Sequence, residues 1–151
     1  MLKAKDIMTR DVVTVGPETE VTAVAKLLLE KRFNGVPVVD EKNNVVGVIC
    51  QSDLIAQQKK LPLPSVFNLL DTLIPIISPG RIEKEVEKIA AVKVSQAMTP
   101  DPVTVSPETD IEQIAALMVN KGYHTIPVVK EDKLVGVIGK EDVLRTIAPG
   151  E

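Results

Sequence analysis

The sequence contains few side chains that could perform nucleophilic or acid–base chemistry. Cys50 is its only cysteine and His124 its only histidine. A dyad of these two would need a thiolate activated across the molecule, and Cys50 ends the apolar run V-V-G-V-I-C, where a small apolar filler is the simpler interpretation. No glycine-rich phosphate loop of standard spacing is present, and one cysteine allows neither an internal disulfide nor a thiolate metal site. We therefore expect a non-catalytic protein with no catalytic residue and no metal site.

The sequence repeats itself. Residues 3–54 align with residues 93–143 at an offset of 90, which falls to 89 after one deletion. The aligned strings are Met8-Thr9 with Met98-Thr99, Val13-Thr14-Val15 with Val103-Thr104-Val105, Pro37-Val38-Val39 with Pro127-Val128-Val129, Val46-Gly47-Val48-Ile49 with Val135-Gly136-Val137-Ile138, and Asp53 with Asp142. The deletion falls in a polar stretch between two apolar runs, residues 40–45 in the first copy, and therefore predicts a hairpin turn there.

Each copy is predicted to run strand, helix, strand, strand, helix. In the first copy, residues 13–15 alternate as a short strand, and apolar residues then recur at helical spacing over residues 21–29 after a Pro-Glu-Thr start signal. Two short apolar strands follow at residues 36–39 and 45–49, and residues 53–55 open a second helix. We expect an α/β (α+β) fold of two βαββα motifs.

The two copies are expected to pack against each other. A unit of about 50 residues leaves one apolar face of its small sheet uncovered, and the other copy is the obvious partner for that face. Face-to-face packing of equivalent units gives a pseudo-twofold axis with two equivalent clefts along the seam. Ligand pockets form in such places, so we expect function in these clefts.

The segment between the copies has no counterpart after the second copy, and it is too long and too apolar for a simple linker. We therefore divide the chain into a first motif at residues 1–58, a helical insertion at residues 59–91 and a second motif at residues 92–151. Apolar side chains of the insertion, among them Phe67, Leu70 and Leu73, either cap the module's own core or form an exposed patch for self-association or a partner.

The repeated strings resemble those of a known family. M-T-x-x-x-V-T-V, h-P-V-V and V-G-V-I-x-x-x-D occur in both copies and resemble the tandem cystathionine-beta-synthase-type (CBS) domain, or Bateman module, over about two thirds of the chain. The resemblance implies a regulatory, energy-sensing module that binds an adenosyl ligand (AMP, ADP, ATP or S-adenosylmethionine) between its two motifs. It also implies a disc-shaped homodimer and an effector protein that the sequence does not name. The alternative is a ligand-free structural or dimerisation adaptor that acts through residues 59–91.

In the family, the acidic residue that opens the second helix binds the ribose hydroxyls, which the resemblance carries to Asp53 and Asp142. A carboxylate can accept two hydrogen bonds from a vicinal diol, and a helix N-terminus supplies donors for phosphate. Alternatively, both acids only cap their helices. The family's Ser or Thr three residues earlier is replaced by Cys50 and Gly139, so we expect a broken capping box and a missing ligand contact in both copies.

Further ligand contacts are expected at the entry to the second strand and along the walls of the clefts. The resemblance places phosphate-facing residues at Asn34-Gly35 and His124-Thr125, although His124 could instead satisfy backbone groups. Lys140 and Lys121 are possible cations around the second cleft. Residues expected to line the cleft around the base are Val13, Thr14 and Val36 in one copy and Val103, Thr104 and Ile126 in the other.

Charge and hydropathy indicate which partners and which cellular compartment to expect. The 18 Lys and Arg and the 21 Asp and Glu give a net charge of -3 and are interleaved along the chain, which does not favour a nucleic-acid partner. No window reaches the roughly 18 apolar residues of a membrane span, and the N-terminus lacks the pattern of a signal peptide. We expect a cytoplasmic protein with no membrane span.

Overall fold

The computed structural model describes residues 1–60 and 92–148. The predicted insertion, including Phe67, Leu70 and Leu73, lies almost entirely outside these residues, and the predicted division of the chain at residues 58 and 91 stays a prediction. Within the described ranges, no helix combines the length and apolarity needed to cross a membrane.

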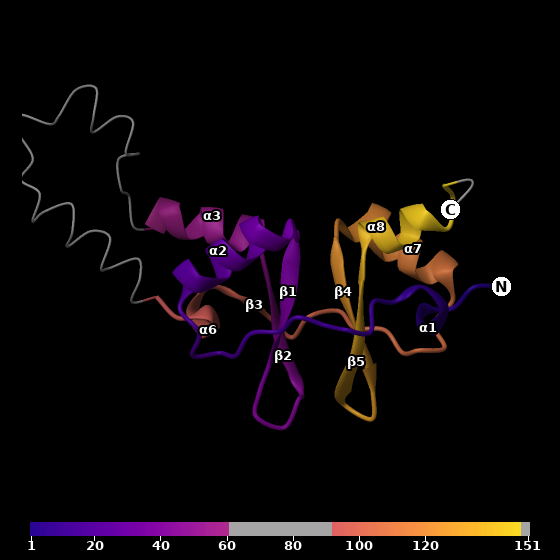
Figure 1. Ribbon diagram of the computed structural model, residues 1–151, viewed down its shortest axis with the longest axis horizontal. Coiled ribbons are helices and arrows are strands. Elements are labelled where there is room, and N and C mark those ends of the chain that lie inside the picture. Colours follow the sequence, from indigo (N-terminus) through magenta and orange to yellow (C-terminus); the bar gives the residue numbers. More distant parts are fainter. Residues whose placement is uncertain (61–91, 149–151) are drawn as a thin grey trace, which may run out of the picture.

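The described residues form two similar halves (Figure 1). The first half contains α2 (Val21–Lys31), β1 (Gly35–Val39), β2 (Val45–Cys50) and α3 (Gln51–Lys60), and the second contains α7 (Ile111–Lys121), β4 (Thr125–Lys130), β5 (Lys133–Gly139) and α8 (Lys140–Arg145). In each half two helices lie on the outer side of a β-hairpin, and the two hairpins face each other in the middle of the molecule. The predicted α+β fold of two packed copies is therefore confirmed.

The hairpins have the predicted strands and turns. Both pairs are antiparallel, with Val36 opposite Ile49 and Ile126 opposite Ile138. The β4–β5 connection consists of residues 131–132, whose positive φ angles of 53° and 67° are typical of a two-residue hairpin loop. Because the β1–β2 connection is longer, the one-residue deletion does mark a turn.

The strand predicted at residues 13–15 is wrong. Only Val15 pairs with β1: its N–H donates to the carbonyl of Pro37 at 3.2 Å, and its own carbonyl accepts the N–H of Val39 at 3.0 Å. The second copy repeats this single bridge at Val105. No longer strand forms, because the segment before Val15 crosses from the second half, where Thr9 bridges β5, and a turn at Pro17 and Glu18 follows Val15.

Each half has its own aliphatic core. The buried clusters are Val21, Val24, Leu28, Val36, Val38, Ile49 and Val94 in the first half, and Ala4, Val105, Ile114, Ile126, Val128 and Ile138 in the second. Such cores are what a composition with 2% aromatic residues requires. Leu29 continues the apolar spacing of α2 but is 77% exposed, so the apolar pattern of this helix extends beyond the face it buries.

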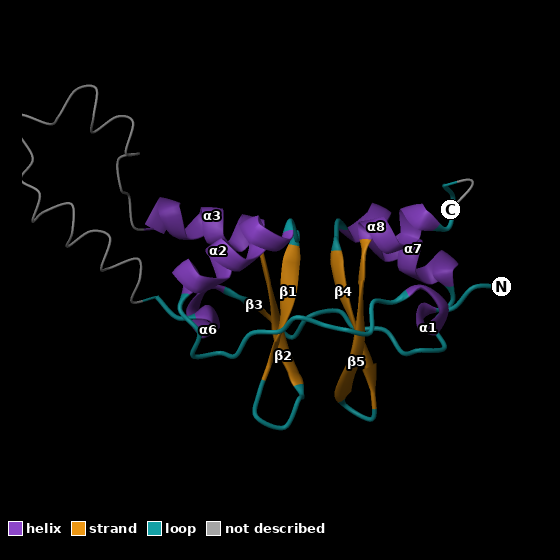
Figure 2. Ribbon diagram, in the orientation of Figure 1, coloured by secondary structure: helices purple, strands orange, loops and turns teal. Residues whose placement is uncertain are grey.

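The N-terminal segments of the two copies are exchanged. Ala4, in the short helix α1 (Ala4–Ile7), belongs to the second core, and Val94, in α6 (Val94–Ala97), belongs to the first. The Ala4 N–H donates to the carbonyl of Thr109, and the Val94 N–H to that of Thr19, both at 2.8 Å. Figure 2 shows the loops that follow α1 and α6 crossing between the halves. Each copy therefore completes the other.

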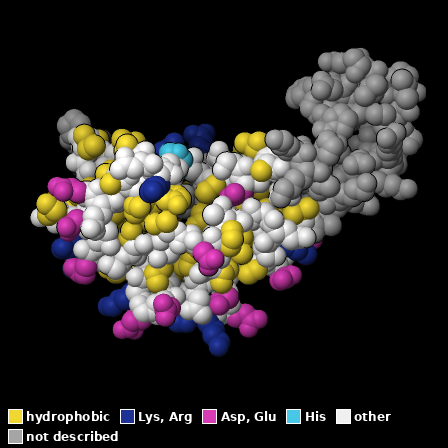
Figure 3. Space-filling view, turned by 180° about the vertical axis from the view of Figure 1, so that it is seen from behind, with side chains coloured by type: hydrophobic (Ala, Val, Ile, Leu, Met, Phe, Trp, Pro, Cys, Tyr) yellow, Lys and Arg dark blue, Asp and Glu magenta, His cyan; other side chains and the backbone are white. Residues whose placement is uncertain are grey.

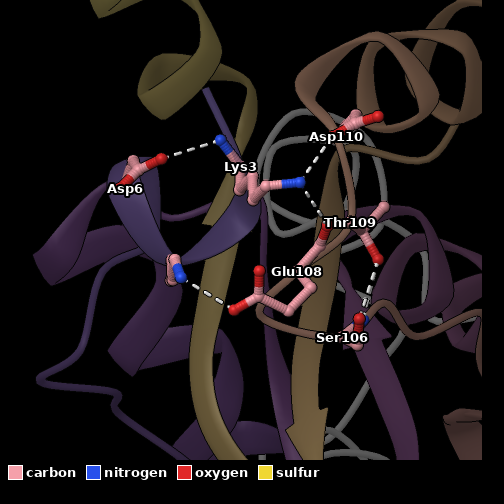
Figure 4. Close-up of polar contacts among 7 residues, drawn as sticks. Lys3, Asp6, Ser106, Glu108, Thr109 and Asp110 are labelled. Carbon is pink, nitrogen blue, oxygen red and sulfur yellow. Dashed lines mark hydrogen bonds and ion pairs between the residues drawn. The ribbon is translucent and has the colours of Figure 1, made fainter. Parts of the chain in front are cut away.

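Charged side chains position α1 on the second half (Figure 4). Lys3 Nζ lies 3.0 Å from Asp110 Oδ1, and Lys5 Nζ lies 2.8 Å from Glu108 Oε1. The hydrogen bond between Lys5 and Glu108 raises the pKa of the lysine and lowers that of the glutamate. Exposed ion pairs contribute little stability, so their main effect is to fix the orientation of α1.

The exchange places two of the repeated strings in contact with each other. The strand β3 (Thr99–Pro100) pairs with β2, and Thr9 makes the equivalent bridge to β5. At these crossings Met98 lies over Gly47 and Met8 over Gly136, and a Cβ added to either glycine would lie 2.5 Å from the methionine sulfur. The Met-Thr string of one copy and the Val-Gly-Val-Ile string of the other thus form one contact.

The ends of the hairpins also join the two halves. The Leu134 N–H donates to the Asn43 carbonyl at 3.1 Å. Lys133 Nζ donates to the carbonyl of Lys42 at 2.8 Å and to Asn44 Oδ1 at 3.0 Å. Together with the packing of β1 against β4, these bonds hold the sheets face to face.

Candidate functional site

Two clefts lie along the seam between the halves. The Asp53 cleft, of about 470 Å³, is lined by the start of α3, by the 99–103 segment and by residues 121–125. The Asp142 cleft, of about 140 Å³, is lined by the 9–13 segment, by residues 32–37 and by the start of α8. Only the Asp53 cleft falls in the usual size range of small-molecule pockets. Figure 3 shows hydrophobic side chains gathered near the middle of one face, with Lys, Arg and His side chains at its upper edge.

Asp53 lies in the first turn of α3 and is half-buried. Its Oδ2 accepts the backbone N–H of Cys50 at 2.8 Å, and its Oδ1 accepts the hydroxyl of Thr99 at 3.2 Å. Thr99 belongs to the exchanged segment of the second copy. The carboxylate therefore lies at the junction of the two copies.

Asp142 makes the same two contacts in the other cleft. Its Oδ2 accepts the Gly139 N–H at 2.8 Å, and its Oδ1 accepts the Thr9 hydroxyl at 3.2 Å. It also makes a contact that Asp53 makes with no described residue, because Arg145 Nη1 lies 2.6 Å from Oδ1. The Asp142 side chain is 7% exposed and that of Arg145 is 67% exposed, so this ion pair covers the carboxylate from the solvent side.

The capping prediction needs a correction. The cap residues Cys50 and Gly139 provide no hydroxyl, but the other half of the box is intact, since each aspartate accepts the N–H of its cap residue. The box is thus half-formed in both copies. The capping role of Asp53 and Asp142 is real, and it leaves other acceptor positions of each carboxylate for other donors.

The predicted phosphate-side residues divide between the clefts. Asn34, His124 and Thr125 line both clefts, whereas Gly35 and Lys140 line only the Asp142 cleft. The prediction that Lys121 and Lys140 surround the same cleft is wrong, because Lys121 lines the Asp53 cleft. The reason is the seam itself, which places the end of α7 and the start of α8 in different clefts.

The predicted base-lining residues are only partly in place. Val13 and Val36 line the Asp142 cleft and Val103 lines the Asp53 cleft, so each cleft combines aliphatic residues of one copy with the aspartate of the other.

The other three residues predicted to lie around the base, Thr14, Thr104 and Ile126, line neither cleft. Thr14 and Thr104 line separate surface grooves, since successive side chains of an extended segment point to opposite sides. Ile126 is fully buried in the core of the second half.

Cys50 and His124 both line the Asp53 cleft, which makes the dyad a geometric possibility. However, burial and the nearby charge of Asp53 raise the pKa of the Cys50 thiol to about 11. A nucleophilic cysteine needs the opposite shift, since the thiolate is the reactive form. The environment of Cys50 therefore disfavours nucleophilic chemistry at neutral pH.

The model of the CBS domain matches residues 4–60 and again residues 94–149, which together make up most of the chain. The chain belongs to the CBS domain family. It carries two CBS domains, and the exchanged contacts, the hairpin pair and the two clefts all lie within the matched residues.

Known CBS proteins resemble the chain along nearly its whole length. The chloroplastic CBS domain-containing protein CBSX1 of Arabidopsis thaliana is 31% identical over 151 residues, which cover 93% of this chain and 61% of CBSX1. CBSX2 of the same plant is matched over an equal share, so the chain spans less than two thirds of these two relatives.

Solved structures show the same fold. The structure of CBSX2 in complex with AMP has a TM-score of 0.73 at 29% identity and covers 97% of this chain and 96% of that one. The CBS domain pair of MJ0100, in complex with 5′-methylthioadenosine and S-adenosylmethionine, has a TM-score of 0.71 at 21% identity, covering 97% and 96% of the two chains. At that identity MJ0100 shows the shared fold alone.

Three contact residues were not assigned a role from the sequence of this CBS pair: Thr9, Thr99 and Arg145. The threonines were visible as part of the repeated Met-Thr string, but nothing in a string indicates that it contacts the opposite copy. Arg145 had a usable signal, since it follows Asp142 by three residues on a helix, a spacing at which opposite charges pair.

Proposed function

We propose that this CBS pair is a non-catalytic regulatory module that binds an adenosyl ligand in the Asp53 cleft. The observation that carries the proposal is the carboxylate of Asp53. It opens onto a cleft of about 470 Å³, and among the described residues each of its oxygens accepts one neutral donor, Cys50 N–H and Thr99 Oγ. A carboxylate has about four acceptor positions, so two remain for the vicinal hydroxyls of a ribose.

The other groups of the cleft favour a ligand of low charge. Val103, Lys121 and His124 line this cleft; Val103 is our candidate for an aliphatic contact to a base, and the other two are our candidates for contacts to a phosphate. Asp53 and Asp101 line the same cleft and oppose additional negative charge. We therefore rank AMP above ADP and ATP, and a relative, CBSX2, has been crystallised in complex with AMP.

The proposal is tested by thermal unfolding and isothermal titration calorimetry with AMP, ADP, ATP and S-adenosylmethionine. A ligand that binds only the native state at 100 times its Kd adds about 2.7 kcal/mol of stability, which raises Tm by roughly 5 to 10 °C for a domain of this size. We expect AMP to produce this shift. If none of the four ligands moves Tm at millimolar concentration, the proposal is wrong.

The variant Asp53→Asn tests the role of the carboxylate. The amide oxygen can still accept a hydrogen bond from Cys50, but the side chain loses its charge and its second acceptor oxygen. We expect at least tenfold weaker AMP binding in a folded protein. The matched control is Asp132→Asn in the β4–β5 turn, where φ is 67° and asparagine is equally suited. Equal affinities of the two variants would exclude Asp53 as the ribose acceptor.

We also infer that the module dimerises through its helices. Four large aliphatic side chains are exposed at equivalent positions of the two copies: Leu29 and Val119, at 77% and 82%, and Ile55 and Leu144, at 69% and 58%. Single exposed apolar residues are ordinary, but these four form two equivalent pairs. A surface with approximate twofold symmetry is best complemented by another such surface, which favours a second copy of this chain as the partner.

A further inference from the structure

The two clefts differ at the carboxylate that would receive a ribose. We propose that Arg145 blocks the Asp142 cleft by occupying that carboxylate, so that the chain offers a single open adenosyl site, the Asp53 cleft. This inference rests on the proposed function and concerns which of the two related clefts is used.

The two aspartates form a comparison within one chain. Both accept a backbone N–H at 2.8 Å and a threonine hydroxyl at 3.2 Å. Asp142 accepts in addition Arg145 Nη1 at 2.6 Å. At an offset of 89, the residue equivalent to Arg145 is Ala56, which has no side-chain donor. Among residues 1–60 and 92–148, one side chain therefore accounts for the difference in their contacts.

The number of unoccupied acceptor positions decides which carboxylate can bind a ribose diol. Of about four positions on a carboxylate, the backbone, the threonine and the arginine occupy three on Asp142, which leaves one for a diol that needs two. Asp53 has two left. Because Asp142 is almost fully buried, its bond to the guanidinium is also less screened by water than a surface pair, and a neutral diol would have to displace it.

The size of the clefts agrees with this assignment. The cleft that contains Arg145 measures about 140 Å³, against about 470 Å³ for the cleft with alanine at the equivalent position. The first value is below the range of typical ligand pockets and the second lies within it.

Removing the arginine side chain should leave the fold intact. Arg145 is the last residue of α8 and is 67% exposed, and alanine is favoured in helices. Asp53 has the same backbone and threonine donors and pairs with no described cation, so we expect Asp142 to tolerate the loss of Arg145.

The experiment is isothermal titration with AMP of the wild type, Arg145→Ala, Asp53→Asn and the double variant Asp53→Asn/Arg145→Ala. We expect one site per chain in the wild type and two in Arg145→Ala. We also expect at least tenfold tighter binding to the double variant than to Asp53→Asn, because the ligand then enters the Asp142 cleft. The control is Asp53→Asn/Lys130→Ala, which also removes one positive charge but does so at the far end of β4. It should bind AMP no better than Asp53→Asn.

The outcomes separate this inference from the proposed function. If the wild type binds AMP but the double variant binds no better than Asp53→Asn, Arg145 does not block the cleft and the proposed function stands. If only the variants with Arg145→Ala bind, the block is supported and the Asp53 site is wrong. Weaker binding of Arg145→Ala than of the wild type would mean that Arg145 contacts the ligand, which overturns the inference, and absence of binding throughout overturns both.

Discussion

At the scale of single residues, Cys50 shows how position decides reactivity. It lines the Asp53 cleft, but burial and the charge of Asp53 raise its pKa to about 11. At pH 8 the thiolate fraction is then about one in a thousand, against roughly a quarter for an unperturbed cysteine.

We predict that Cys50 reacts with iodoacetamide at pH 8 at least a hundredfold more slowly than a free cysteine. The rate should rise with pH up to about pH 11, because deprotonation creates the nucleophile. Asp53→Asn should speed the reaction at pH 8, since removing the charge lowers the pKa of the thiol. Mass spectrometry of the alkylated protein measures these rates, and labelling of the wild type at the rate of free cysteine would contradict the assigned environment.

From the sequence, functional residues could be predicted where the two copies are alike, but not where they differ. Asp53 and Asp142 were singled out because they align, and both lie in clefts. Arg145 aligns with an alanine, so a comparison of the copies gave it no weight, although it changes the chemistry of its cleft. Ile126 was misplaced for a different reason: an aliphatic residue can line a pocket or fill a core, and only packing distinguishes the two.

At the scale of elements, the contact between exchanged segment and hairpin places strict limits on two glycines. A Cβ at position 136 would lie 2.5 Å from Met8 Sδ and 3.1 Å from the carbonyl oxygen of Thr9. The sulfur is at the end of a flexible side chain and can move, but the carbonyl belongs to the bridge between Thr9 and β5.

We predict that Gly136→Ala destabilises the protein by about 1 to 3 kcal/mol, the usual cost of overpacking, although alanine reduces the entropy of the unfolded chain. Urea unfolding measures the change. The added substitution Met8→Ala should recover part of the loss. The control is Gly16→Ala, where the nearest atom lies 3.9 Å from the added Cβ; a loss as large there would mean that the contact with Met8 is not the cause.

The elements themselves could largely be predicted from the sequence. Helical and alternating apolar spacings gave the helices and hairpins, and the deletion gave the turn. The exchange of the N-terminal segments could not be predicted, because a repeat shows which segments are alike and not which segments touch. Residues 13–15 have the composition of a strand, but the crossing before them and the turn after them limit them to one bridge.

At the scale of the whole molecule, the outer helices present duplicated apolar residues. We predict that Leu29→Glu combined with Val119→Glu converts a dimer into a folded monomer, because burying two carboxylates without partners costs several kcal/mol. Sedimentation equilibrium measures the mass. Lys42→Gln with Lys130→Gln makes the same change in net charge near the hairpin turns, at the far end from the helices (Figure 1), and should leave the dimer intact.

If the wild-type protein is monomeric at hundreds of micromolar, or if the doubly substituted protein remains dimeric, the helices are not the dimer interface. The alternative interface, through residues 59–91, would then be the one to test.

The crossing of α1 and α6 between the halves also bears on how such a chain could originate. In an ancestor with a single copy, the first residues would have packed into the core of another molecule. Such an ancestor could have formed a complete core only as a symmetric dimer of identical polypeptides. Gene duplication and fusion would join these two polypeptides while keeping every contact. After fusion the copies no longer had to be identical, and an arginine could arise in one without appearing in the other.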